Sequence, residues 1–174
     1  MSNLDSFFSD NGVLSKHITG YRARIQQLEM AQAIADTIAS NEILVAEAGT
    51  GTGKTFAYLV PALLAGGKVI ISTGTKTLQD QIFSRDLPTI RNALKAPVTV
   101  ALLKGRANYI CHYYLERTTQ NEHVSFINRD EAKYLKLIES YANVSNTGDK
   151  SGLSEVSENA GIWQQVTSTR ENCL

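Results

Sequence analysis

The chain has 174 residues, of which 43% are hydrophobic, enough to bury the core of one domain or two small ones and to exclude general disorder. Its 17 basic residues balance 17 acidic ones, so binding of nucleic acid must depend on a local surface and not on bulk charge. No apolar run is long enough to cross a membrane, and the N-terminus lacks the pattern of a secretory leader. These features predict a cytoplasmic protein without a membrane partner.

The first part of the chain alternates helical and strand-like patterns. In chain order, the expected elements are an arm over 1–20, a helix over 21–40, a strand at 43–46, a helix ending near 65, a strand at 69–71, a helix over 75–85 and a strand at 98–103. Pro61 is expected to kink or shorten its helix, and the next helix is expected to end near Leu87-Pro88. Strands joined through helices predict an α/β fold with a parallel sheet flanked by helices over residues 21–104.

The remainder, residues 105–174, changes character and lacks a clear strand pattern. Apolar residues on one side of 130–141 predict a helix there, and 143–161 is rich in loop-forming residues. The last residues carry no terminating signal, so the chain is expected to be incomplete.

A phosphate-binding loop is the strongest signal in the sequence. Its members are Ala48, Gly49, Thr50, Gly51, Thr52, Gly53, Lys54 and Thr55. They match the Walker A pattern, except that Ala replaces its first Gly. Glycines allow main-chain N–H groups to surround phosphate oxygens, Lys54 is expected to reach the β- and γ-phosphates, and Thr55 to bind Mg²⁺. A strand before the loop and a helix after it favour this reading over a simple connector.

Upstream of the loop, a glutamine pair offers a way to recognise adenine. An amide donates and accepts hydrogen bonds at once, which suits the adenine edge. Gln27 is the first candidate and Gln26 the second, while two solvated glutamines on a helix remain the alternative.

Three segments together resemble motifs of the iron–sulfur DNA helicases of the XPD/DinG group in superfamily 2. They are EAGTGTGKT at 47–55, VIISTGTKTLQDQ at 69–81 and LKGRANYIC at 103–111. The likeness runs from residue 20 to the end of the chain. It implies that 21–104 is the first part of a RecA-like helicase domain and that 105–174 begins a mainly helical iron–sulfur insertion.

The resemblance also implies roles for individual residues. Arg24 and Gln27 resemble an adenine-reading Q motif, and Thr73 to Gln81 resembles motif Ia, which contacts the backbone of single-stranded DNA. The DNA-binding candidates are Thr73, Gly74, Thr75, Lys76, Gln79, Lys104 and Arg106. A helix start capped by Thr75, and a solvated basic turn around Lys104, are the alternatives.

Cys111 and Cys173 resemble two of the four ligands of the family's [4Fe-4S] cluster. Such clusters require four thiolates, so the site is incomplete in this chain, which has two cysteines. Taken without the resemblance, two scattered cysteines are more often buried, unremarkable thiols.

Asp130-Glu131-Ala132-Lys133 imitates the DEAH box of helicases, but no buried strand precedes it. It is better interpreted as the start of an amphipathic helix. The acidic Walker B motif, the second RecA-like domain and its arginine finger are therefore expected to be absent. Since phosphoryl transfer needs these groups, the chain is expected to bind nucleotide without hydrolysing it appreciably.

The resemblance implies an ATP-dependent helicase that moves 5′→3′ on single-stranded or forked DNA in replication or repair. Some members of the group are associated with the chi subunit of the DNA polymerase III clamp loader. Two alternatives stay open on the residues themselves: a nucleotide-binding regulatory or scaffold module without motor activity, and another P-loop enzyme such as a small-molecule kinase.

Overall fold

The computed structural model describes residues 4–120 and 129–173 and divides the chain into two compact units, Met1–Leu102 and Leu103–Leu174. In unit 1 the elements are α1 (Asp5–Phe8), η1 (Leu14–Lys16), α2 (Ile25–Ser40), α3 (Lys54–Ala65), α4 (Lys76–Gln81), η2 (Ile82–Asp86) and α5 (Leu87–Leu94). In unit 2 they are η3 (Arg106–Asn108), α6 (His112–Gln120), α7 (Arg129–Val144), η4 (Lys150–Gly152) and α8 (Trp163–Val166). No helix in these described ranges combines the length and apolar character needed to cross a membrane.

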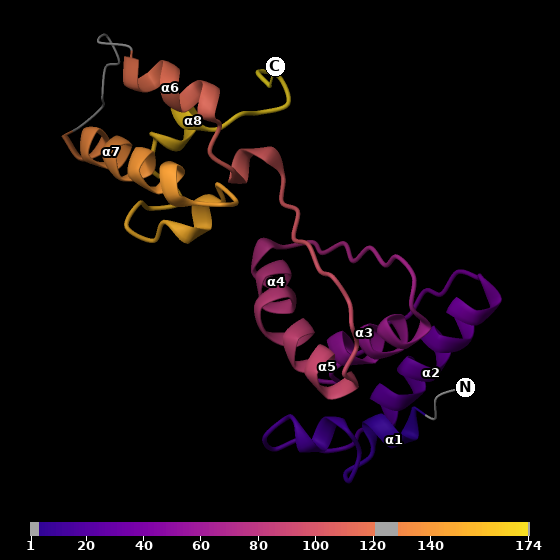
Figure 1. Cartoon of the computed structure of the whole chain (residues 1–174). Helices are drawn as coiled ribbons and strands as arrows, with labels where there is room; N and C mark the ends of the chain where they lie inside the picture. Colours follow the sequence, from indigo (N-terminus) through magenta and orange to yellow (C-terminus); the bar gives the residue numbers. More distant parts are fainter. Residues whose placement is uncertain (1–3, 121–128, 174) are drawn as a thin grey trace. The chain divides into compact units, whose positions relative to one another are not determined.

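Unit 1 is built around α2 and α3, which pack side by side (Figure 1). Ala31 of α2 and Ala57 of α3 are fully buried, and such small side chains allow two helices to approach closely. Leu59 and Val60 extend the same core toward Ile90 of α5. The helix that begins at the phosphate loop is therefore held on two sides.

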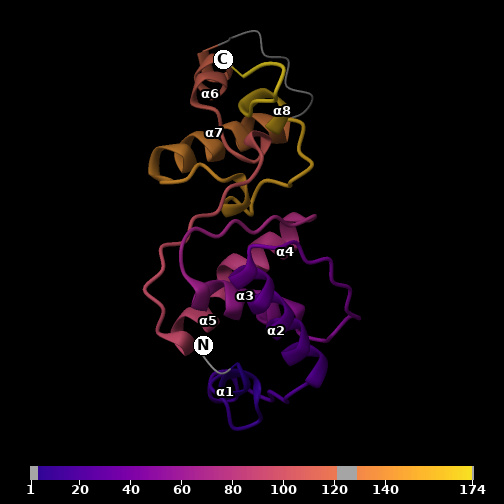
Figure 2. The ribbon, with the colours of Figure 1, turned by 90° about the vertical axis from the view of Figure 1, so that its right-hand side faces the viewer.

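The segment expected to be an N-terminal arm is part of the core of unit 1. Phe8 at the end of α1 and Leu14 at the start of η1 are buried in the same hydrophobic cluster as α3 and α5. Figure 2 shows this N-terminal segment folded beside α2. Its burial anchors the residues that lead into α2.

The parallel sheet expected in unit 1 is not formed in the described residues, where the only β-type pairs are two isolated bridges in unit 2. The segments 43–46, 69–71 and 98–103 have no regular secondary structure. Ile43 is 93% exposed and Ile70 is 95% exposed. A strand that is apolar on both faces needs neighbours on both edges and a layer on each face, and these segments lack such partners here.

The helices expected from the apolar periodicity are formed, although some of their bounds differ from those expected. α2 starts four residues later than expected, because Arg24 has extended backbone angles and serves as its N-cap. Pro61 lies inside α3, which continues to Ala65, and Pro88 does not end the helical path. The wider π-type turn of η2 lets α5 restart, so Pro88 occupies a first turn, where no N–H donor is required.

Unit 2 has its own core between α7, α8 and the loops that join them. Ile138, Ile162 and Val166 are fully buried, and Trp163 packs among them while its Nε1 donates to Ser157 O at 2.8 Å. The expected helix at 130–141 is confirmed by α7. The sequence did not predict α6.

Leu14→Ala tests whether the N-terminal segment belongs to the core of unit 1. Because Leu14 is fully buried, truncation removes apolar contacts and leaves a cavity, so the free energy of unfolding should fall by about 3 kcal/mol. Leu103→Ala is the control, since Leu103 is 81% exposed. Denaturant unfolding would contradict this packing if the two variants were equally stable.

Candidate nucleotide and DNA sites

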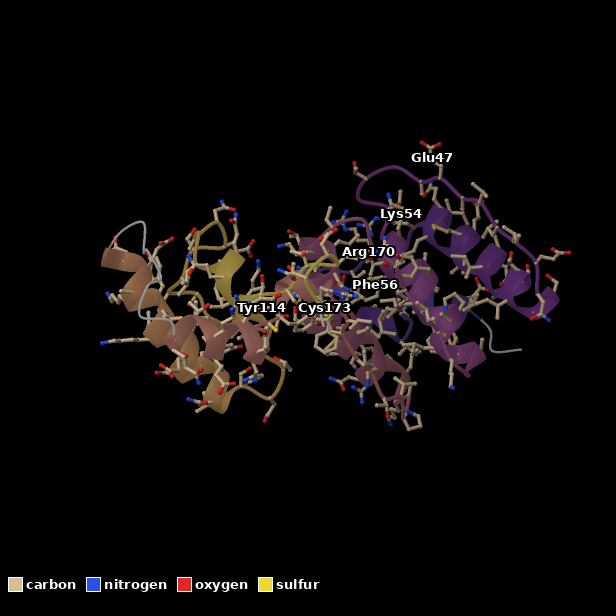
Figure 3. All side chains as sticks on the ribbon, turned by 90° about the horizontal axis from the view of Figure 1, so that it is seen from above. Glu47, Lys54, Phe56, Tyr114, Arg170 and Cys173 are labelled. Carbon is tan, nitrogen blue, oxygen red and sulfur yellow. The ribbon has the colours of Figure 1, made fainter. Side chains whose placement is uncertain are left out.

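The phosphate loop leads directly into α3, which begins at Lys54. Gly51 and Gly53 have φ angles of 80° and 82°, a left-handed backbone that favours glycine. Gly49, Thr50 and Gly51 are exposed, the rest of the loop is half-buried, and Figure 3 shows the Glu47 side chain projecting outward just ahead of it. A turn of small residues before a helix N-terminus is a geometry suited to binding anions.

The Lys54 side chain folds back over the loop. Its Nζ donates to Ala48 O at 2.7 Å and to Gly49 O at 2.8 Å, while Thr52 Oγ1 donates to Gly49 O at 3.0 Å. The positive charge therefore lies at the loop and is held by carbonyl oxygens that an anion can replace. Lys54 and the loop residues predicted from the sequence are brought together.

Gln27 is connected to the end of the loop. Its side chain is buried, with 2% of the residue exposed, and Nε2 donates to Gly53 O at 2.9 Å. Oε1 accepts a hydrogen bond from Tyr21 Oη at 3.1 Å. The structure thus separates the two candidate glutamines: Gln27 contacts the loop, whereas Gln26 and Arg24 are exposed.

Thr55, the expected magnesium ligand, lies in the first turn of α3 and is half-buried. Burial raises the pKa of Tyr58, a hydrogen bond with the Thr55 side chain lowers it, and the negative charge of Asp86 raises it again. The net pKa of Tyr58 is raised. The Thr55 hydroxyl thus lies beside the Tyr58 phenol at the start of α3.

The candidate motif for DNA contact lies at the start of α4. Thr75 is the N-cap of this helix, and its Oγ1 accepts a hydrogen bond from Leu78 N at 3.3 Å. Thr73 Oγ1 donates to Thr75 O at 3.1 Å. The capping interpretation of Thr75 is confirmed, and Gly74 and Lys76 are exposed beside it.

Lys104 does not lie on a solvated basic turn. It is buried in unit 2, where its Nζ is 2.9 Å from Asp149 Oδ2 and 3.1 Å from Ser151 Oγ. Burial alone raises the pKa of Asp149, but hydrogen bonds from Lys104 and Ser151 outweigh it and hold the pKa below its ordinary value of 3.8. Lys104 is thus engaged in structure, while Arg106 in η3 is exposed.

The two cysteines belong to unit 2. Cys111 is half-buried and its N–H donates to Val166 O at 2.8 Å, while Cys173 is exposed. Tyr114 Oη donates to Asn172 O at 2.7 Å and so ties α6 to the segment that carries Cys173, as the labels in Figure 3 allow the reader to follow. Within 4–120 and 129–173, no three histidine, cysteine or acidic residues are grouped as a metal site, so the donors present do not complete one.

Two residues near these sites were missed by sequence reasoning. Tyr21 contacts Gln27, and Asp149 pairs with Lys104. A single tyrosine upstream of a helix and an aspartate in a polar loop carry no periodic or motif signal. Only the folded arrangement identifies their partners.

Comparisons with known proteins agree on one family. A family model described as DEAD/DEAH box helicase matches residues 24–137. The chain is 48% identical to the ATP-dependent DNA helicase YoaA of Haemophilus influenzae over 99% of this chain and 27% of that protein. It is also 48% identical to YoaA of Escherichia coli over 96% of the chain and 26% of that protein. It is 35% identical to a Bacillus subtilis protein named 3'-5' exonuclease DinG, over 88% of this chain and 16% of that protein. The chain thus spans about a quarter of the length of the YoaA relatives it matches.

Gly53→Ala tests the backbone geometry of the phosphate loop. A Cβ at Gly53 would collide with Gln27 Nε2, and the left-handed φ adds strain, so unfolding free energy should fall by more than about 1 kcal/mol. Gly49→Ala is the matched control, because a Cβ there meets nothing within 4 Å. Equal losses in the two variants, measured by denaturant unfolding, would contradict the described geometry.

Asp149→Asn tests the buried pair of unit 2. Removing the carboxylate takes away the negative charge that lies 2.9 Å from the buried Lys104 ammonium, which should cost about 3 kcal/mol of unfolding free energy at neutral pH. Because folding lowers the pKa of Asp149, the wild-type contribution is full above 3.8 and is lost as the pH falls through the lowered value. The variant should lack this acid-dependent loss, whereas Glu155→Gln, an exposed control, should keep it.

Proposed function

The chain belongs to the DEAD/DEAH box helicase family, and we propose that it binds ATP with Mg²⁺ and contacts single-stranded DNA as part of an ATP-dependent DNA helicase. The observation that supports this proposal most is the position of Lys54. It is the first residue of α3, and its Nζ lies against Ala48 O and Gly49 O of the glycine-rich loop. Relatives named ATP-dependent DNA helicase support the same activity.

Binding of the triphosphate uses groups that the loop already presents. Main-chain N–H groups at the start of α3 attract phosphate oxygens, and the helix dipole adds to this attraction. Lys54 exchanges its bonds to Ala48 O and Gly49 O for bonds to phosphate, which is the stronger, charge-assisted interaction. Bound Mg²⁺ would neutralise phosphate charge, with the Thr55 hydroxyl as its protein ligand. Arg24 is proposed to lie toward the adenine, whereas the Gln27 amide, whose two ends bond to Tyr21 and Gly53, is proposed to support the loop.

Contact with DNA is proposed for the start of α4. Thr73, Gly74, Thr75, Lys76 and Gln79 supply hydroxyl, main-chain, ammonium and amide donors, which bind phosphate without reading sequence. Arg106 is retained in the proposal because it is exposed, and Lys104 is left out because its charge is buried against Asp149. Movement in the 5′→3′ direction, forked DNA as a substrate and a role in replication or repair come from the family resemblance.

An iron–sulfur cluster is proposed only for a longer protein that contains these residues. Cys111 and Cys173 would supply two of four thiolates, and two more must come from elsewhere. When bound, such a cluster would cross-link the segments that carry its ligands. The association of this helicase group with the chi subunit of the clamp loader is proposed for the longer protein in the same way.

Lys54→Ala tests nucleotide binding directly. Titration calorimetry with MgATP should detect binding by the 174-residue chain and a loss of affinity of about tenfold or more in the variant, because a charge-assisted phosphate contact is removed. Lys16→Ala, which removes an exposed lysine of η1, should bind like the wild type.

A flat titration with the wild-type chain would refute the proposal. The same samples are proposed to release no phosphate, because the sequence offers no candidate for the Walker B acid and arginine finger that phosphoryl transfer needs. Turnover that disappears in Lys54→Ala would contradict that expectation.

A further inference from the structure

Tyr21 lies where the N-terminal segment meets α2, and its hydroxyl touches two groups. It is 2.9 Å from Phe8 O and 3.1 Å from Gln27 Oε1, and Gln27 Nε2 in turn donates to Gly53 O at 2.9 Å. We propose that Tyr21 is a positioning residue for nucleotide binding: through Gln27 it holds Gly53 and the first turn of α3 in place. This inference rests on the proposed binding of ATP.

The argument begins with the two ends of the Gln27 amide. Gly53 offers a carbonyl oxygen, so only the NH₂ end of the amide can bond to it. A flipped amide would place two oxygen atoms against each other inside a buried site. The single proton of the Tyr21 hydroxyl is shared between Phe8 O and Gln27 Oε1, so the phenol supports the orientation in which Nε2 faces the loop.

The second step concerns Gly53 itself. This glycine has a φ of 82°, precedes Lys54 directly and is in close contact with the Gln27 side chain. Its carbonyl also accepts the N–H groups of Phe56 and Ala57 at 3.1 and 3.2 Å, so it closes the first turn of α3. A shift of Gln27 would therefore move the turn that carries Lys54.

The third step explains why Tyr21 can act as an anchor. Phe8, whose carbonyl contacts the hydroxyl, is 2% exposed and belongs to the core of unit 1. Ala23, two residues after Tyr21, donates its N–H to Asp10 Oδ1 at 2.7 Å. Burial raises the pKa of Tyr21, with Arg24 opposing and Asp10 adding to this effect, so the hydroxyl stays protonated at neutral pH. The tyrosine is thus tied to the N-terminal segment at both sides.

This role differs from adenine recognition in what it predicts. A residue that positions the loop affects the phosphates, which ATP and GTP share. A residue that reads the base affects ATP and GTP differently. Tyr21→Phe should therefore weaken MgATP and MgGTP by the same factor, about fivefold, which corresponds to the loss of one buried hydrogen bond.

The experiment compares Tyr21→Phe with Tyr141→Phe in the 174-residue chain by titration calorimetry. Tyr141 is the matched control: its hydroxyl donates to Asp149 O at 2.9 Å in unit 2, and its loss should leave nucleotide affinity unchanged. Adding Tyr21→Phe to Gln27→Ala should cause no further loss, because Tyr21 acts through Gln27. In nucleotide-free protein, NMR should show the Gln27 side-chain amide protected from exchange in the wild type and exposed to exchange in Tyr21→Phe.

The outcomes separate this inference from the proposed function. Unchanged affinities in Tyr21→Phe, a loss confined to ATP, or additive losses with Gln27→Ala would each overturn the positioning role while leaving ATP binding intact. Absence of nucleotide binding in the wild type would refute the proposed function. In that case the NMR comparison still decides the matter: retained protection in Tyr21→Phe overturns the role of Tyr21, and lost protection supports it.

Discussion

The hydrogen bond from Gln27 to Gly53 O is the constraint on which unit 1 depends. It joins α2 to the residue that caps α3, at the point where the backbone takes a left-handed turn. Leaving the buried Gln27 amide without a partner would cost about 1–3 kcal/mol, so the bond to Gly53 O holds the glutamine against the loop. The loop is therefore held at its C-terminal end, next to the lysine that the proposed chemistry requires.

Unit 2 depends on a different kind of polar contact. Lys104 and Asp149 form an ion pair with both side chains largely removed from water, and Ser151 shares the lysine. Taking these charges out of water is costly, and the pair is tolerated only because each charge meets its opposite. A basic residue within a family motif thus stabilises the fold of unit 2, although its position in the sequence is typical of a phosphate contact.

The parts that sequence reasoning predicted are those with local causes. The phosphate loop and the apolar stripes of α2 and α7 are encoded within a few residues, and all appear in the structure. The contacts of Tyr21 with Gln27 and of Lys104 with Asp149 depend on which segments meet in space, and no periodicity reports that. The expected strands at 43–46 and 69–71 failed for a related reason, because a strand is defined by its neighbour and these segments have none among the described residues.

The uncovered apolar runs have a practical consequence for anyone handling this polypeptide. Ile43 and Val45, each 93% exposed, and Ile70 lie in segments that form no β-ladder with any other described part of the chain. Such exposed apolar segments can pair through their backbones with the same segments of another molecule and so promote aggregation. Concentrated samples should consequently aggregate through these segments. Charged substitutions at Ile43, Val45 or Ile70 should reduce that aggregation.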